Sequence, residues 1–156
     1  MNNCVIVRKQ IVQDTLGELQ TAGRRRSECV ILWLGQRDFQ GITVARMWKP
    51  EQEADRGYFL IPEKSVDRLM AELRKERLMI AAQVHTHPKL AFHSAADDKW
   101  AIVRHVGALS LVVPHYALRT NAVNFVQRTA AFCLNAENEW LQAPQENIQD
   151  FYKIVP

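Results

Sequence analysis

The sequence has few of the features that would divide it or carry it into a membrane. In 156 residues no apolar run approaches the ~20 residues needed to span a bilayer. The start, Met1-Asn2-Asn3, lacks the basic residues and long apolar core of a signal peptide. Repeats, low-complexity tracts and Gly/Ser-rich linkers are also absent. We therefore expect one domain over residues 1–156, in a cytoplasmic protein without a membrane partner.

Cysteine and excess charge are also scarce. Cys4, Cys29 and Cys133 are far apart and show no C-x-x-C spacing, which indicates reduced core thiols rather than disulfides. The net charge is only +3, and the one dense basic run is the three arginines at 24–26. Such a run is usually a solvated loop, and its best functional interpretation is a contact for an acidic partner. Without a basic stripe interleaved with aromatics, no nucleic-acid partner is expected.

What is present is the composition of a globular protein, with 47% apolar and 24% charged residues. Apolar patterning predicts helices over 10–22, 94–104 and 145–153, and one that starts at Pro62. It predicts strands over residues 5–8, 28–34, 41–48, 58–61, 78–85, 108–113, 121–134 and 139–142. Strands and helices without regular alternation indicate an α+β sandwich around a single mixed sheet.

One short segment carries the residues best suited to chemistry. His85 and His87 end an apolar strand, where side chains two apart project from the same face. Pro88 ends the strand because it lacks the N–H that a ladder would use. Ser94 can cap the next helix, which places Asp97 at the third helical position. Two imidazoles and one carboxylate make a three-ligand metal site with a position open for water, the arrangement of catalytic zinc.

Each part of this pattern also has a purely structural interpretation. Ser-x-x-Asp before a helix is an ordinary capping signal, and a lone His-x-His is often a chance surface pair. Their occurrence together, with a proline between them, favours the metal site. Zinc lowers the pKa of a bound water to about 7 and so supplies a hydroxide nucleophile near neutral pH.

His85-Thr86-His87-Pro88 followed by Ser94-Ala95-Ala96-Asp97 resembles the H-x-H-P…S-x-x-D motif of the JAMM, or MPN+, metalloproteases. The spacer, residues 88–93, is one residue shorter than in the usual motif and is similar to that of prokaryotic JAB proteins. The resemblance implies a JAB/MPN fold, a cytidine-deaminase-like sandwich. It also implies one Zn²⁺ per chain, held by His85, His87, Asp97 and a water; the motif count favours Asp97 over Asp98.

The same family has a glutamate on an early strand, within a pattern like E-x-x-x-L-x-x-G. Glu28 opens such a pattern, which ends at Gly35. On packing grounds alone Glu28 would be a strand-edge charge facing water. The resemblance implies instead that Glu28 is the general base and that the Ser94 hydroxyl holds the developing oxyanion. His93 is expected at the rim of the site, in a structural rather than a catalytic role.

The resemblance implies a zinc isopeptidase or peptidase that cleaves after the C-terminal tail of a ubiquitin-like protein, to remove conjugates or to process a precursor. Prokaryotic JAB proteins are encoded beside ubiquitin-like proteins and activating- and conjugating-type enzymes, including in antiphage systems such as CBASS. These proteins are the expected partners. The tail is expected to bind as an added strand, with the polar loop 50–57 as one wall of its groove. An ordinary hairpin loop is the alternative interpretation of that segment.

Two other functions have less support. A catalytically silent MPN scaffold would lack the metal ligands, whereas all the expected ligands and the glutamate are present. A nucleobase deaminase would need H-x-E and P-C-x-x-C, and the sequence has neither.

Overall fold

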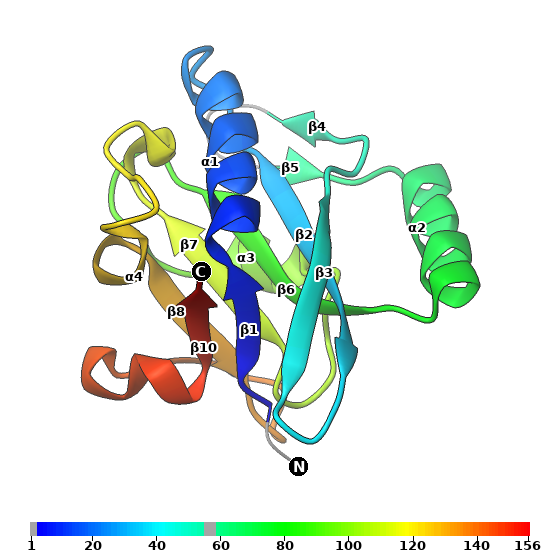
Figure 1. Cartoon of the computed structure of the whole chain (residues 1–156). Helices are drawn as coiled ribbons and strands as arrows, with labels where there is room; N and C mark the ends of the chain where they lie inside the picture. Colours follow the sequence, from blue (N-terminus) through cyan, green and yellow to red (C-terminus); the bar gives the residue numbers. More distant parts are fainter. Residues whose placement is uncertain (1–2, 55–58) are drawn as a thin grey trace.

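A mixed eight-stranded sheet forms the centre of the computed structural model, which describes residues 3–54 and 59–156 (Figure 1). The strand order is β10-β1-β3-β2-β6-β7-β8-β9. The strands are β1 Val5–Arg8, β2 Val30–Arg37, β3 Ile42–Trp48, β6 Met79–Thr86, β7 Leu109–Val113, β8 Ala130–Leu134, β9 Trp140–Gln142 and β10 Tyr152–Val155. β6 pairs antiparallel with β2 and parallel with β7, so it lies in the middle of the sheet.

Helices flank this sheet, and a separate two-stranded sheet lies beside it. The α-helices are α1 Lys9–Gly23, α2 Glu63–Glu76, α3 Ala95–Trp100 and α4 Phe125–Arg128. The 3₁₀ helices cover His115–Ala117 and Gln145–Asp150, and the small sheet pairs β4 Glu53–Ala54 with β5 Phe59–Leu60. The predicted α+β sandwich with a mixed sheet and flanking helices, of the JAB/MPN type, is confirmed.

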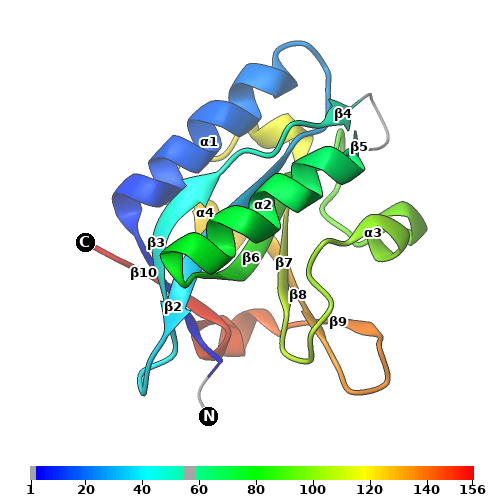
Figure 2. The ribbon, with the colours of Figure 1, turned by 90° about the vertical axis from the view of Figure 1, so that its right-hand side faces the viewer.

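The two faces of the sheet have separate cores, and β2 shows why. Its side chains alternate: Ile31 and Trp33 enter the core that contains α1, whereas Val30, Leu32 and Leu34 enter the core that contains Leu69 of α2. All five are fully buried. A strand covered on both faces is apolar throughout, as the sequence of β2 is. Figure 2 shows α2 crossing in front of the strands, with α1 on the other side of the fold.

Most predicted elements are observed within two residues of their predicted ends, among them β1, β3, β6, β7, β9 and α1, and α2 starts one residue after the predicted Pro62. β2 begins two residues after Glu28 and continues through Gly35 to Arg37. The predicted loop 50–57 contains β4, and its residues 55–57 lie outside the described residues, as does residue 58 of the strand observed as β5. Cys4, Cys29 and Cys133 are free thiols, as predicted.

Two predicted helices are wrong in extent or type. The helix predicted over 94–104 ends at Trp100, and Ala101, with φ −58° and ψ 122°, is no longer helical. After the helix, Val103 is buried in the core that contains Leu69 of α2, and the chain then continues to β7. The helix predicted over 145–153 is a 3₁₀ helix that ends at Asp150 and is followed by β10.

β10 forms because it finds a partner at the other end of the chain. It pairs parallel with β1, with Val5 opposite Tyr152, and Tyr152 is fully buried. A strand predicted over 121–134 is likewise wrong in its first half, which contains α4; only Ala130–Leu134 pairs with β7. Among the residues that the structure describes, none of the helices combines the length and apolar character needed to cross a bilayer.

Candidate active site

The two histidines of the H-x-H-P segment lie at the carboxyl end of β6. His85 is paired opposite Val30 of β2, so its ring is on the face of the sheet that α2 covers. His87 follows the strand, two residues on, and its ring centroid is 5.3 Å from that of His85. Both side chains are buried. The local strand geometry therefore places two imidazoles side by side, as predicted.

The backbone around His87 is held from two directions. The His87 N–H donates to the carbonyl of Val113, and the His87 carbonyl accepts from the N–H of Tyr116. The turn His115–Ala117 that supplies this N–H has φ between 53° and 61° at all three residues, a left-handed conformation that costs energy for non-glycine residues. α1 packs closely here, since a Cβ on Gly23 would collide with the Tyr116 carbonyl oxygen. Tight packing thus fixes the histidine segment in place.

Asp97 reaches the histidines from α3. Its Oδ1 lies 3.2 Å from His85 Nε2, and its Oδ2 lies 3.0 Å from His87 Nε2. Ser94 is the N-cap of α3: its hydroxyl accepts a hydrogen bond from the Asp97 N–H, while its own N–H donates to Asp97 Oδ2. This reciprocal capping box orients the carboxylate towards the rings. One group of interactions therefore both starts the helix and aims Asp97.

The three side chains fit a metal ion. One ligand atom from each of His85, His87 and Asp97 can be chosen so that all lie within 4.8 Å of one another, and all three residues are buried. Burial raises the pKa of Asp97, but hydrogen bonds from His85 and His87 outweigh this and hold the pKa well below its ordinary value. A buried carboxylate in direct contact with two imidazoles is the donor set of hydrolytic metal sites.

Glu28 lies next to this cluster because β2 pairs with β6. The Cys29 N–H donates to the hydroxyl of Thr86, and the Thr86 N–H donates to the Cys29 carbonyl, so the residue before Cys29 is brought beside His87. Only 3% of Glu28 is exposed. Burial raises the pKa of Glu28 to about 7, against an opposing effect of His87. The alternative of a strand-edge charge in water is therefore excluded.

Aromatic rings surround the two histidines. The Phe92 ring meets the edge of His87 at 4.5 Å between centroids. His93 lies 6.0 Å from the ring of His85 and stacks near Phe132 and Trp140, at 5.2 and 4.9 Å. His93 is half-buried in this stack, which agrees with the structural role expected of it.

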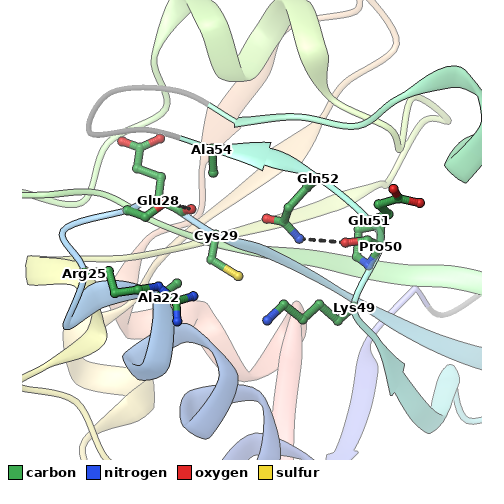
Figure 3. A pocket seen from close by; sticks show the side chains of 10 residues that line it. Ala22, Arg25, Glu28, Cys29, Lys49, Pro50, Glu51, Gln52 and Ala54 are labelled. Atoms are coloured by element: carbon green, nitrogen blue, oxygen red, sulfur yellow. Dashed lines mark hydrogen bonds between the residues drawn. The ribbon is translucent and has the colours of Figure 1, made fainter.

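Two cavities meet at Glu28. A cavity of about 270 Å³ is lined by Glu28, His87, Pro88, Lys89, Phe92 and Ser94. A larger one of about 520 Å³ lies on the other side (Figure 3) and is lined by Ala22, Arg25, Ser27, Glu28, Cys29, Lys49, Pro50, Glu51, Gln52 and Ala54. The described part of the predicted loop 50–57 therefore does border a hollow that reaches the site.

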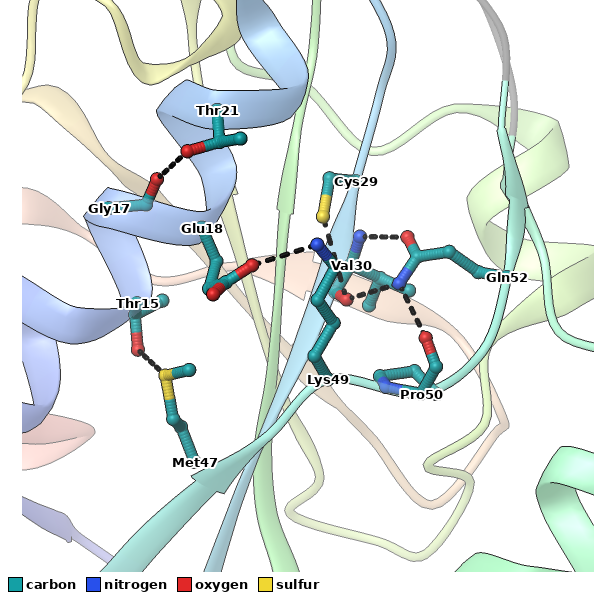
Figure 4. A network of polar contacts seen from close by, with 10 residues as sticks. All are labelled: Thr15, Gly17, Glu18, Thr21, Cys29, Val30, Met47, Lys49, Pro50 and Gln52. Carbon is teal, nitrogen blue, oxygen red and sulfur yellow. Dashed lines mark hydrogen bonds and ion pairs between the residues drawn. The ribbon is translucent and has the colours of Figure 1, made fainter.

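Gln52 is a site-forming residue that the sequence did not indicate. Its side-chain amide accepts from the Val30 N–H and donates to the carbonyls of Val30 and Pro50 (Figure 4). The Gln52 amide thus pairs with the backbone of Val30 as a neighbouring strand would. These hydrogen bonds also fix the segment before β4 against the start of β2. A glutamine in a polar loop carries no sequence signal for such a role.

A comparison with curated proteins finds the probable metalloprotease y4jG of Sinorhizobium fredii (strain NBRC 101917 / NGR234), which is 31% identical over 144 residues. The match spans 90% of this chain and 87% of that protein. The chain belongs to this metalloprotease family. Together with the cluster of His85, His87 and Asp97, the relationship fits a JAMM-like metalloprotease. No protein-family model matches the chain.

Solved structures share the fold. The solution structure of protein DSY2949 from Desulfitobacterium hafniense has a TM-score of 0.67 at 16% identity and spans 97% of this chain and 92% of its own. A protein from Salinibacter ruber (strain DSM 13855) has a TM-score of 0.57 at 15% identity, with 88% of each chain covered. At these identities the likeness concerns the fold alone.

Proposed function

We propose that this metalloprotease is a zinc-dependent isopeptidase or peptidase of the JAMM type, which cleaves after the C-terminal tail of a ubiquitin-like protein. The observation that carries the proposal is the buried convergence of His85, His87 and Asp97 beside Glu28. A site with metal ligands and a separate titratable carboxylate has the parts that amide hydrolysis needs.

His85, His87 and Asp97 would hold the metal, and we propose zinc because two imidazoles and one carboxylate leave a fourth position open in a tetrahedral site. When bound, the metal would activate a water molecule and polarise the scissile carbonyl. The capping box keeps the Asp97 carboxylate turned towards the rings. The ligands are therefore oriented before any metal arrives.

Glu28 is proposed as the proton carrier of the reaction. It lines the same cavity as His87 and Ser94, so it faces the place where a scissile bond would lie. In the metal-free fold burial raises the pKa of Glu28 to about 7, so its surroundings accept both the carboxylate and the carboxylic acid. Glu28 can therefore accept a proton from the attacking water and return it to the leaving amine.

Ser94 is proposed to hold the developing oxyanion. Its hydroxyl oxygen accepts the Asp97 N–H, and a hydroxyl that accepts one hydrogen bond still has a hydrogen to donate. Capping therefore uses the hydroxyl oxygen as an acceptor, and oxyanion binding would use the hydroxyl hydrogen as a donor, so one Ser94 can serve both roles. Such a donor contributes about 3 kcal/mol in other oxyanion holes.

The substrate tail is proposed to run beside β4. β4 pairs with β5 on one edge, and no other described strand pairs with it. An extended peptide could add as a strand there, with Ala54 and Gln52 towards the larger cavity and Glu28 at its end. The smaller cavity, between Pro88 and Phe92, would take the residues on the other side of the scissile bond.

The physiological setting is proposed from the spacing of the H-x-H-P…S-x-x-D motif, which resembles prokaryotic JAB proteins. This resemblance supports a role in deconjugation or precursor processing, alongside activating- and conjugating-type enzymes of a bacterial antiphage system.

The test is to incubate the zinc-loaded protein with a ubiquitin-like protein encoded next to it that carries a C-terminal extension. Cleavage after the tail, read by intact mass, is the expected result. Glu28→Ala should retain zinc and lose cleavage. Purified protein without bound metal, or unchanged cleavage in Glu28→Ala, would contradict the proposal; the first outcome would favour a scaffold.

A further inference from the structure

The three arginines at the end of α1 form an exposed cationic turn. Arg24, Arg25 and Arg26 are all exposed, and their N–H groups donate to carbonyls of the last turn of α1. Among residues 3–54 and 59–156, no acidic side chain forms an ion pair with any of the three. The charge of this turn is therefore not neutralised within the described part of the fold.

Arg25 differs from its neighbours because it lines the larger cavity. Figure 3 shows its side chain and that of Lys49 approaching each other from two sides, with the sulfur of Cys29 between them. Burial raises the pKa of the Cys29 thiol to about 11, while the charges of Lys49 and Arg25 act in the opposite direction. Both cations are thus close to the same wall of the cavity.

The acidic groups around this cavity are engaged elsewhere. Lys49 Nζ is 2.8 Å from Glu18 Oε2, which neutralises one cation (Figure 4). Glu51 lies 3.5 Å from Arg68 of α2, and Figure 3 shows its carboxylate turned away from Arg25. The Glu28 carboxylate points away from Arg25. Arg25 is therefore left as the cation available to a ligand.

We propose that this cavity binds an acidic side chain of the substrate, paired with Arg25. The inference rests on the proposed function, since it names a substrate feature near the bond that Glu28 would help to cleave. A guanidinium can bind a carboxylate through two parallel hydrogen bonds, which a polar uncharged side chain cannot match. An exposed pair of this kind contributes a selectivity of about fivefold, enough to rank substrates but not to exclude them.

The test compares two dye-labelled peptides that differ only in having glutamates or glutamines near the middle. Binding is measured by fluorescence anisotropy with the zinc-loaded full chain carrying Glu28→Gln, so that cleavage does not interfere. The glutamate peptide should bind about fivefold more tightly at low salt. Adding Arg25→Gln should abolish the difference, and Arg25→Glu should reverse it, so that the glutamine peptide binds more tightly. Arg24→Gln, the same charge change outside the cavity, should preserve it.

Equal affinity for both peptides would overturn the inference, as would an equal effect of Arg24→Gln and Arg25→Gln, which would indicate a diffuse surface charge. The wild-type cleavage assay separates this from the proposed function. Cleavage without charge selectivity in binding would contradict the acidic subsite but not the proposed function. Selective binding without cleavage of any tested substrate would contradict the proposed function and still support the acidic subsite.

Discussion

The two sides of Glu28 differ in burial and in the contacts that their side chains make. On one side His85, His87 and Asp97 are at most 3% exposed, and the Asp97 carboxylate lies 3.2 Å from His85 Nε2 and 3.0 Å from His87 Nε2. On the other side the exposed Arg25 borders a hollow of about 520 Å³. Fixed buried groups can stabilise a transition state without reorganising, whereas exposed charges contribute only a few-fold in affinity. Changes on the metal side should therefore affect turnover, and changes on the Arg25 side should affect substrate choice.

The largest effect is expected for Asp97→Asn. The substitution keeps the shape of the side chain but removes the charge that faces both histidines, so metal affinity and turnover should fall together, turnover by about 10,000-fold or more. Metal content by elemental analysis and peptidase rates check this. Asp67→Ala, on the exposed face of α2, is the control and should change neither. If Asp97→Asn kept its full metal content and a normal rate, Asp97 would be neither a metal ligand nor necessary for turnover.

Glu28→Gln should separate metal binding from proton transfer. Glu28 lines the cavity beside His87 without belonging to the metal cluster, so the variant should retain its metal while turnover falls by about 1,000-fold. Glu63→Gln, an exposed change at the start of α2, should leave the rate unaltered. If Glu28→Gln lost its metal as well, Glu28 would be a ligand and not the base.

Ser94→Ala tests whether the cap and the chemistry share one hydroxyl. Turnover should fall by about 100-fold, and the loss of the cap on α3 should lower the free energy of unfolding by about 1 kcal/mol. Ser94→Thr retains a hydroxyl and should restore both the rate and most of the stability. A Ser94→Ala variant that lost stability but kept its kcat would leave Ser94 with the capping role alone.

The raised pKa of Glu28 gives a pH dependence of stability in the metal-free protein. Between its ordinary pKa of 4.5 and the folded value of about 7, the folded state holds a proton that the unfolded state has released. The free energy of unfolding should therefore fall as pH rises through this range, by roughly 2–3 kcal/mol. Urea denaturation at pH 4 and pH 8 measures it. Glu28→Gln should lack most of this fall; an identical pH profile would show that burial does not perturb Glu28.

The metal side of the site is predictable because it is local in sequence. His85 to Asp97 spans one strand end, a proline and a helix cap, each with its own short-range signal. The interval between His85 and His87 is set by strand geometry, and that between Ser94 and Asp97 by the first turn of a helix. The sequence motif thus contains the geometry that Asp97 needs to face both rings.

The other side was decided by tertiary structure. Glu28 meets His87 only because Cys29 forms hydrogen bonds with Thr86, 57 residues away in sequence. Gln52 fixes the cavity wall by its hydrogen bonds to Val30. β10 exists only because β1 offers it an edge. Short-range preferences determine where a helix starts and which way a strand's side chains point. Which distant segments become neighbours depends on hydrogen bonds and packing that form only when the whole sheet assembles.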